Sequence, residues 1–312
     1  MIKNSSFKRI ITASFALVIV ILSIYIFPKN EVKIPSKTIY KKVETSAIYL
    51  IDKNEYVART TINIDAKEKE ALAIELLNAL INGTTKNKYL PNGFTSLIPA
   101  GTKINKVSIN GDLLTVDFNE NFLNTQNTND EKMIETIVYT LTEIEGIKNI
   151  KILVNGNELL KLPSSSKNIP PILNRSIGIN KKVKSSSFKD TQNVTTYFIS
   201  NNKEYYIPVT MITDNNDEKI EIIIKELESR DNIDNNLSTY ISAGTTLQNY
   251  QVLENEFNME FNDLIFNGLS DIEEETIYGL ALSIKDNYDI DKISIDVNNK
   301  QIKTFDLKKS WK

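Results

Sequence analysis

The stretch LIPAGTKINKVSINGDLLTVDFNENF, residues 97–122, decides the fold, because its pattern returns in YISAGTTLQNYQVLENEFNMEF, residues 240–261. In each stretch an apolar residue, a two-residue gap and Gly-Thr precede two β-rich runs. The second run ends in an acid that is soon followed by an Asn. Gly101 and Gly244 lie 143 positions apart, so the repeating unit is far longer than the quoted stretches. The spacing indicates two copies of one structural unit.

Each copy is predicted to begin with a hairpin. Residues 47–64 contain two β-rich runs around Asp52-Lys53-Asn54, and residues 195–212 contain two runs around Asn201-Asn202. Asn tolerates the positive φ that tight hairpin turns require.

A helix is predicted after each hairpin. In the first copy Asp65 and Glu68 have the spacing of a capping box, and Gly83 is the predicted stop. The apolar stripes predict core faces, formed by Leu72, Leu76, Leu77, Leu80 and Ile81 in the first copy and by Ile220, Ile223, Ile224 and Leu227 in the second.

The quoted stretches predict a second hairpin in each copy. In the first copy its strands are residues 104–109 and 113–118 around the turn Asn110-Gly111, and the second copy turns at Glu254-Asn255. A second helix follows, with predicted capping boxes at Thr128 and Glu131 and at Ser270 and Glu273. A third hairpin, around Asn-Gly or Asn-Asn, completes each copy.

The shared order of hairpin, helix, hairpin, helix and hairpin predicts an α+β protein of two tandem domains. Each domain is expected to have a mainly antiparallel sheet with two helices on one face. We place the first domain at residues 46–162 and the more divergent second domain at residues 191–308. Residues 163–190, rich in Ser, Lys and Pro, are the predicted linker.

Composition narrows the chemistry open to the chain. It has 312 residues, a net charge of −3, no cysteine and no histidine. Ser-His-Asp triads, Cys nucleophiles and metal sites of thiolate or imidazole are therefore excluded. The charge also gives no general basic field for nucleic acid. We expect no catalytic, cofactor-binding or metal-binding residues.

The N-terminal segment predicts a membrane anchor. Lys3, Lys8 and Arg9 precede an uncharged run at residues 10–27, whose length at about 1.5 Å per residue just spans a hydrocarbon core. Basic residues before the run favour a cytoplasmic N-terminus with the domains outside. Residues 1–27 are thus the cytoplasmic tip and anchor, and residues 28–45 the stalk. A cleaved signal peptide and a buried core helix are the alternatives.

The first copy resembles the GerMN domain of sporulation and germination proteins. The positions that carry the resemblance run from the end of the first helix to the end of the second hairpin: Gly83, Ile98, Pro99, Gly101, Thr102, Val116, Asp117 and Phe122. In the second copy Ser242 replaces the proline and Glu260 replaces the Asp, so the resemblance is weaker there.

The resemblance implies a non-enzymatic protein outside the cytoplasm that acts in spore formation and germination. Its domains would resemble ring-building folds, which allow oligomerisation. Its partners would be cell-envelope proteins, including those that link mother cell and forespore, with no nucleic acid and no cofactor. Proteins of this kind are often lipoproteins, so an anchor must replace the lipid in a chain without cysteine. The candidate contact loop is Phe94, Leu97, Ile98, Pro99, Gly101 and Thr102; the alternative is that this loop packs its apolar side chains under the sheet.

Other readings of the same residues remain open. Asp117, Asn119 and Asn121 have calcium-loop spacing, but Phe122 and Thr128 stand where an EF-hand needs Gly and Glu. The repeated acid is expected instead to order a turn through local side-chain bonds. A stalked cell-wall or solute-binding module would need exposed rings, such as those of Tyr205, Tyr206 and residues 89–94. A carboxylate-dependent glycosidase would need a pair of acids across a cleft.

Overall fold

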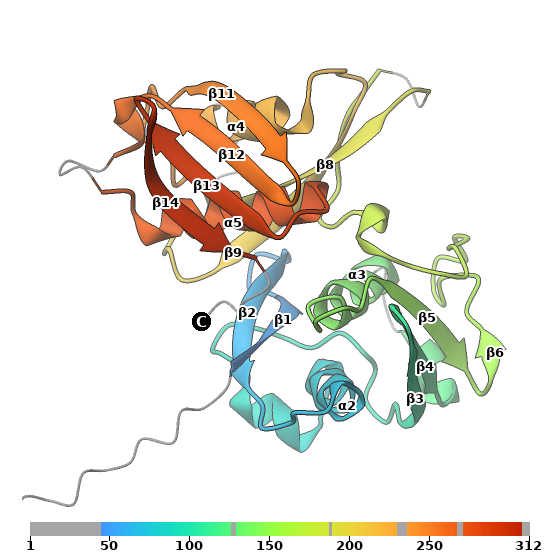
Figure 1. The fold of residues 1–312 in the computed structure, drawn as a ribbon. Helices are drawn as coiled ribbons and strands as arrows, with labels where there is room; N and C mark the ends of the chain where they lie inside the picture. The colour runs from blue at the N-terminus through green and yellow to red at the C-terminus, as the bar shows by residue number, and fades with distance from the viewer. Residues whose placement is uncertain (1–44, 126–128, 187–188, 230–235, 267–270, 308–312) are drawn as a thin grey trace, which may run out of the picture. The chain divides into compact units, whose positions relative to one another are not determined.

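A computed structural model describes residues 45–125, 129–186, 189–229, 236–266 and 271–307 (Figure 1). The predicted anchor at residues 10–27, and the predicted stalk up to residue 44, lie outside these ranges, as do Thr128 and Ser270. Within them, no helix is both long enough and apolar enough to cross a membrane.

The first copy follows the predicted order of elements. The hairpin is β1 (Thr45–Ile51) and β2 (Val57–Asn63), and α2 (Lys69–Leu80) comes next. The chain continues with a 3-10 helix (Thr85–Tyr89), β3 (Ile104–Asn110), β4 (Leu113–Phe118), a second 3-10 helix (Glu120–Leu123), α3 (Asp130–Leu141), β5 (Asn149–Val154) and β6 (Asn157–Glu158).

The second copy repeats this order. The hairpin is β8 (Gln192–Ser200) and β9 (Tyr206–Thr213), and α4 (Lys219–Glu228) comes next. The chain continues with β10 (Leu237–Ser238), β11 (Leu247–Leu253), β12 (Glu256–Phe261), a 3-10 helix (Asp263–Ile265), α5 (Glu274–Asn287), β13 (Lys292–Val297) and β14 (Lys300–Asp306).

Each copy builds a four-stranded sheet with one parallel pair. The strand orders are β3-β4-β5-β6 and β11-β12-β13-β14. The two outer pairs of each sheet are antiparallel, while β4 with β5 and β12 with β13 are parallel and are connected through α3 and α5. The sheets are therefore mainly antiparallel, as predicted, and the parallel pair needs a helix as its crossover.

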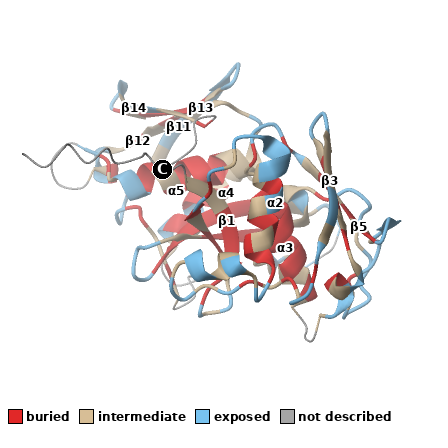
Figure 2. Cartoon of the chain, turned by 90° about the horizontal axis from the view of Figure 1, so that it is seen from below, coloured by how far each residue is buried: buried red, intermediate tan, exposed pale blue. Residues whose placement is uncertain are grey.

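Alternating side chains attach these sheets to the helices. In β4, Leu114, Val116 and Phe118 are buried, while the residues between them are only half-buried. A strand places successive side chains on opposite faces, so one face joins the core. In Figure 2 the helices and β1 are largely buried, whereas connecting loops are exposed. Each fully buried Leu or Ile in this core contributes roughly 1.5–3 kcal/mol.

The first hairpins of the two copies depart from the prediction of one sheet per copy. They join each other in a further sheet, of order β1-β2-β9-β8-β10, with β2 and β9 antiparallel through Arg59 and Tyr206. The helices therefore lie between this shared sheet and the four-stranded sheet of each copy (Figure 1). Ala58 of β2 is fully buried in the core of the second copy. A free hairpin edge satisfies its backbone groups by pairing, which explains the merger.

The capping boxes predicted for the two helices of the first copy do not form. α2 begins at Lys69 with Glu68 as its N-cap, and that cap makes no side-chain hydrogen bond. α3 begins at Asp130 after Asn129, so the prediction that Glu131 occupies the third helical position is also wrong. The turn predicted at Asn110-Gly111 is shifted by one residue, because Asn110 pairs with Leu113.

The predicted linker is built into the fold. It contains a 3-10 helix at Arg175–Ile177 and β7 (Lys182–Lys184), which runs parallel to β9. Leu173 and Ile179 are buried in the core of the first copy. The domain boundaries drawn from the sequence stay a prediction, but residues 163–190 contribute a strand and buried side chains to the fold as well as connecting the copies.

Candidate functional site at the junction of the two copies

The repeated motif forms hydrogen bonds within the first copy. Asp117 Oδ1 accepts from the Gly156 amide at 2.9 Å, which closes the last hairpin onto β4. Asn119 Oδ1 accepts from the Lys103 amide at 2.9 Å, and its amide group donates to the Gly101 carbonyl at 3.3 Å. Gly101 has a φ of 82°, which an L side chain rarely adopts.

The second copy makes the same bonds 143 positions later. Glu260 Oε1 accepts from the Asn299 amide at 3.0 Å. Asn262 Oδ1 accepts from the Thr246 amide at 3.1 Å, and its amide group donates to the Gly244 carbonyl at 2.8 Å. The acid and the Asn therefore order the turns of both copies, but the prediction of local bonding was wrong, because their partners lie 16 to 39 positions away in the sequence.

The six residues of the candidate contact loop have different surroundings. Ile98 and Thr102 are buried, Gly101 is exposed, and Leu97 and Pro99 are half-buried. The Phe94 ring packs edge-on against Tyr205 of the second copy with centroids 4.9 Å apart, and it contacts both cores. Tyr205 in turn donates its hydroxyl to Asp52 at 2.9 Å. Phe94 and Tyr205 thus serve the junction between copies, and the exposed part of the loop is near Gly101.

Equivalent tyrosines meet at this junction. Tyr49 of β1 and Tyr197 of β8 occupy matching places in the segments YLID and YFIS, and their hydroxyl oxygens lie 2.8 Å apart. The Tyr49 hydroxyl donates to Glu143 at 3.0 Å, and the Tyr197 hydroxyl donates to Asp286 at 2.8 Å. Burial raises the pKa of both tyrosines well above the ordinary value, so both remain neutral.

The strands that carry these tyrosines are attached to the helices in the same way. The Tyr49 amide donates to Thr140 Oγ1 at 2.9 Å, and the Tyr197 amide donates to Ser283 Oγ at 3.0 Å. Thr140 and Ser283 lie 143 positions apart, as do Glu143 and Asp286. The junction is therefore pseudo-symmetric in the groups that each copy contributes.

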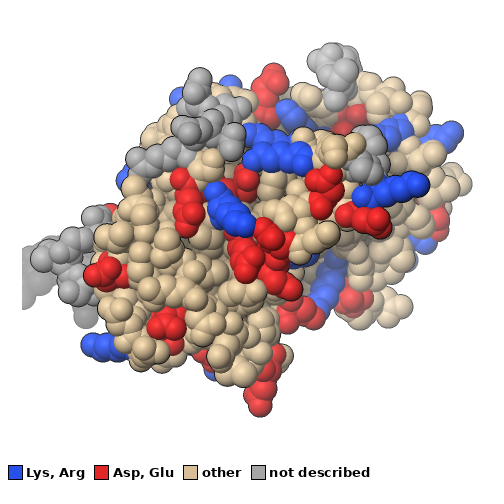
Figure 3. Space-filling view, turned by 90° about the horizontal axis from the view of Figure 1, so that it is seen from above, with Lys and Arg blue, Asp and Glu red and all other residues tan. Residues whose placement is uncertain are grey.

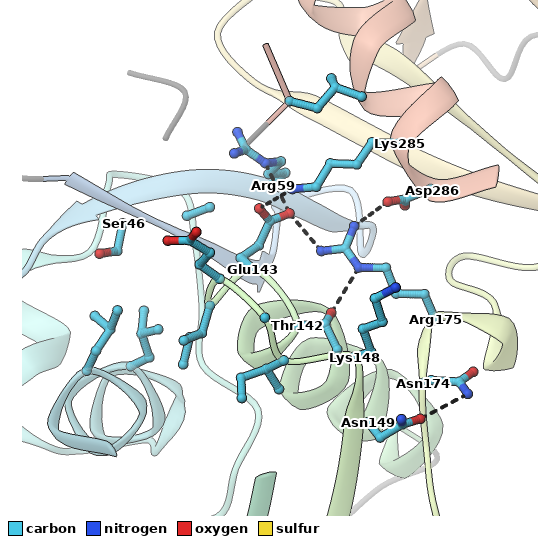
Figure 4. A pocket seen from close by; sticks show the side chains of 18 of the residues that line it. Ser46, Arg59, Thr142, Glu143, Lys148, Asn149, Asn174, Arg175, Lys285 and Asp286 are labelled. Carbon is cyan, nitrogen blue, oxygen red and sulfur yellow. Dashed lines mark hydrogen bonds and ion pairs between the residues drawn. The ribbon is translucent and has the colours of Figure 1, made fainter. Parts of the chain in front are cut away.

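Arg175 of the linker segment binds both carboxylates, and the residues that the structure describes include no second cation that does so (Figure 4). Its guanidinium donates to Glu143 at 2.7 Å and also forms an ion pair with Asp286. It lies over the Tyr139 ring at 4.9 Å. Burial acts to lower the pKa of Arg175, but Asp286, Tyr49 and Glu143 outweigh it and raise that pKa.

Glu143 is shared by three cations. Besides Arg175, Lys285 Nζ lies 3.3 Å and Arg59 Nε 3.7 Å from its carboxylate. Burial would raise the pKa of Glu143, yet Lys285, Arg175 and Arg59 together hold it well below the ordinary value. Glu143 is therefore ionised in the folded protein at neutral pH.

Asn180, also in the linker segment, joins the two hairpins. Its side-chain amide donates to the Val57 carbonyl at 2.8 Å and to the Pro208 carbonyl at 2.7 Å. Its Oδ1 accepts from the Val57 amide at 2.9 Å. One side chain thus supplies ladder bonds to β2 and β9 where they are not paired with each other.

A cavity of about 1140 Å³ opens beside the junction. It is lined by Arg59, Glu143, Lys148, Arg175, Lys285 and Asp286, among others, and Figure 4 shows these side chains around it. No group of three or more acidic side chains suited to a metal occurs in the described ranges. The prediction that the chain binds no metal or cofactor is not tested by that observation.

Sequence reasoning did not find the junction. Arg175 and Asn180 lie in a segment without hydrophobic period, which is typical of a linker. Tyr49 and Tyr197 were expected only to be strand residues. One signal was present in the sequence, because Glu143 and Asp286 follow apolar stripes at the same offset of 143 that relates the Gly-Thr pairs.

Comparison with known proteins gives consistent matches. The Germane family, described as sporulation and spore germination, matches residues 47–160 and 195–303, more than half of the chain. Spore germination protein GerM of Bacillus subtilis strain 168 is 30% identical over 263 residues, which cover 81% of this chain and 71% of that protein. The solved tandem GerMN domains of the sporulation protein GerM from Bacillus subtilis have a TM-score of 0.74 at 29% identity, covering 83% of this chain and 92% of that one.

These matches confirm the resemblance to tandem GerMN domains, with both copies included. The α+β architecture is confirmed by the same solved structure. The chain belongs to the Germane family of sporulation and spore germination proteins.

Proposed function

We propose that this protein is a membrane-anchored, non-enzymatic interaction protein that acts outside the cytoplasm in endospore formation and germination. Membership of the Germane family supports the role in sporulation and germination. The uncharged run at residues 10–27, preceded by three basic residues, supports the anchor and the orientation.

The open edge of the second four-stranded sheet is the observation that carries the interaction role. Within the described residues, β11 pairs with β12 alone and leaves its other edge open. Most of β11 is exposed, including the apolar Val252 and Leu253 at its end. An unpaired strand edge is a template for pairing with another chain. Cell-envelope proteins, including those that link mother cell and forespore, are the proposed partners.

The bonding of the repeated motif supports a role without chemistry. Asp117 and Glu260, the acids that a calcium site would use, each accept a hydrogen bond from a backbone amide within their own copy. Acidic and basic side chains are interspersed on the face seen in Figure 3, without a large area of one sign. We propose the exposed end of the candidate loop, near Pro99 and Gly101, as a second contact.

Single cysteines in the cysteine-free chain test this proposal. Leu253→Cys on β11 and Ala100→Cys in the loop receive a membrane-impermeant photo-crosslinker, added outside intact sporulating cells stripped of their wall. We expect labelling without lysis and a crosslink to a membrane or envelope protein. Leu160→Cys, at a residue 49% exposed, is the control for random collision. Labelling that requires lysis would contradict the orientation, and crosslinks no stronger than those from Leu160→Cys would contradict both contacts.

A further inference from the structure

We propose that the cavity beside the junction binds an oxyanion, a carboxylate or a phosphate group, between Arg59 and Lys285. No part of the interaction role requires this site. The proposal rests on the charge balance of the junction, on the bonding of Arg59 and on the cavity into which both cations face.

The charges at the junction do not balance. Arg59, Arg175 and Lys285 supply three positive charges, whereas Glu143 and Asp286 supply two negative ones. The tyrosines beside them remain neutral, because burial raises the pKa of each. A buried charge without a full partner is costly, so an anion that enters the cavity gains from the excess.

Arg59 is a cation with an unused donor, its Nε. Its residue is only 9% exposed, and its Nε is buried without a hydrogen-bond acceptor among the described residues. The nearest carboxylate oxygen, on Glu143, lies 3.7 Å away, which is too long for a hydrogen bond. By contrast, Arg175 donates to Thr142, Glu143 and Tyr139. A guanidinium offers a planar fork of donors that fits two oxygens of one anion.

The cavity gives a ligand access to these groups. Its volume of about 1140 Å³ is ample for a small anion, and Arg59 and Lys285 both line it. Arg59 Nε lies near Oε1 of Glu143, the oxygen that also accepts from Arg175, whereas Lys285 Nζ lies near Oε2 (Figure 4). Lys148, which lines the cavity further along, is already paired with Asp289 at 3.0 Å. The bound oxyanion therefore lies between Arg59 and Lys285 and leaves the Arg175 bridge intact.

Isothermal titration of the full chain in detergent, with sodium phosphate and with sodium citrate, tests the proposal. Sodium chloride at matched ionic strength is the control for screening. We expect saturable binding of at least one of the two anions at one site per chain. The two arms show whether the site takes phosphate or carboxylate. Saturation by neither anion would overturn the proposal.

Variants locate the site. Arg59→Gln and, separately, Lys285→Gln are expected to weaken binding about tenfold or more, because each removes a charge-assisted contact. Lys148→Gln lines the same cavity and is expected to bind as the parent does. Far-UV circular dichroism identifies any variant that has lost its fold, and two variants on different elements keep the test decisive. Equal affinity in folded Arg59→Gln and Lys285→Gln proteins would contradict the site.

Discussion

Contacts within the two copies and contacts between them follow different rules. Inside the copies, Asp117 binds the Gly156 amide and Glu260 binds the Asn299 amide, so the bond recurs although the acid differs. Between the copies, Arg175 of the linker segment binds the carboxylates of Glu143 and Asp286 at once. The comparison teaches that each copy closes its own turns, while the segment between them creates the junction.

The largest expected effect comes from removing the bridge between copies. Arg175→Met removes the cation paired with Asp286, whose side chain is 1% exposed, and one of the three cations around Glu143. We expect a loss of about 3–5 kcal/mol in the free energy of unfolding, because an unpaired buried charge is costly. Chemical denaturation of the full chain in detergent measures it.

The matched control is an exposed ion pair that also joins the copies. Lys148→Met removes the partner of Asp289, and these side chains are 63% and 90% exposed. We expect a change below about 1 kcal/mol, because water and salt screen such a pair. Similar losses in the two variants would show that burial of the Arg175 bridge has no special role.

A smaller loss is expected at the bond between hairpins. Asn180→Ala removes the acceptor of the Val57 amide and the donor to the Val57 and Pro208 carbonyls. We expect the free energy of unfolding to fall by about 1–3 kcal/mol, because these backbone groups lose their hydrogen-bond partner. Asn193→Ala, which removes one exposed bond to the Ser176 carbonyl, is the control. Equal unfolding midpoints for the two variants would argue against a role for Asn180 in joining the two hairpins.

The junction should also make stability depend on acid. The folded pKa of Glu143 lies well below its ordinary value of 4.5, owing to Lys285, Arg175 and Arg59. Its contribution is therefore fully present above about pH 4.5 and is lost as the pH falls through the lower folded value. We expect the difference in unfolding free energy between the parent and Glu143→Gln to shrink below that pH. A constant difference from neutral pH down to pH 3 would refute the coupling.

The smallest effects test the contacts inside the copies. Asp117→Ala and Glu260→Ala each remove one acceptor of a backbone amide at a turn. Each is expected to cost about 1 kcal/mol, and the two costs should agree within about 0.5 kcal/mol. Thermal unfolding of both variants measures them. A large difference between the two costs would show that the acid does not stabilise the two copies in the same way.

The repeat explains how much of the fold could be predicted. Period-2 burial in β4 and apolar stripes in the helices depend on local sequence, and those elements lie where predicted. The turn at Glu254-Asn255 also forms as predicted, since Leu253 pairs with Glu256. The first residues of the helices were harder to predict, because Asp65 and Glu68 have the spacing of a capping box without forming one. Short polar side chains have competing local partners that spacing alone does not rank.

The junction could not be predicted for a different reason. Tyr49 and Tyr197 are 148 residues apart, and Arg175 and Asp286 are 111 apart. Such contacts depend on how β2 and β9 come together, and an alternating strand pattern does not specify its neighbour. Phe94 is an example, because the sequence does not show that its ring packs on Tyr205 of the second copy. Whether the rest of that loop binds a partner stays a prediction.

Calorimetry of the full chain tests whether the linker segment and the junction make the two copies one cooperative unit. We expect a single unfolding transition whose van't Hoff and calorimetric enthalpies agree. In Arg175→Met the same scan should separate into two transitions or broaden measurably. Two independent transitions in the parent protein, unchanged by Arg175→Met, would contradict the claim.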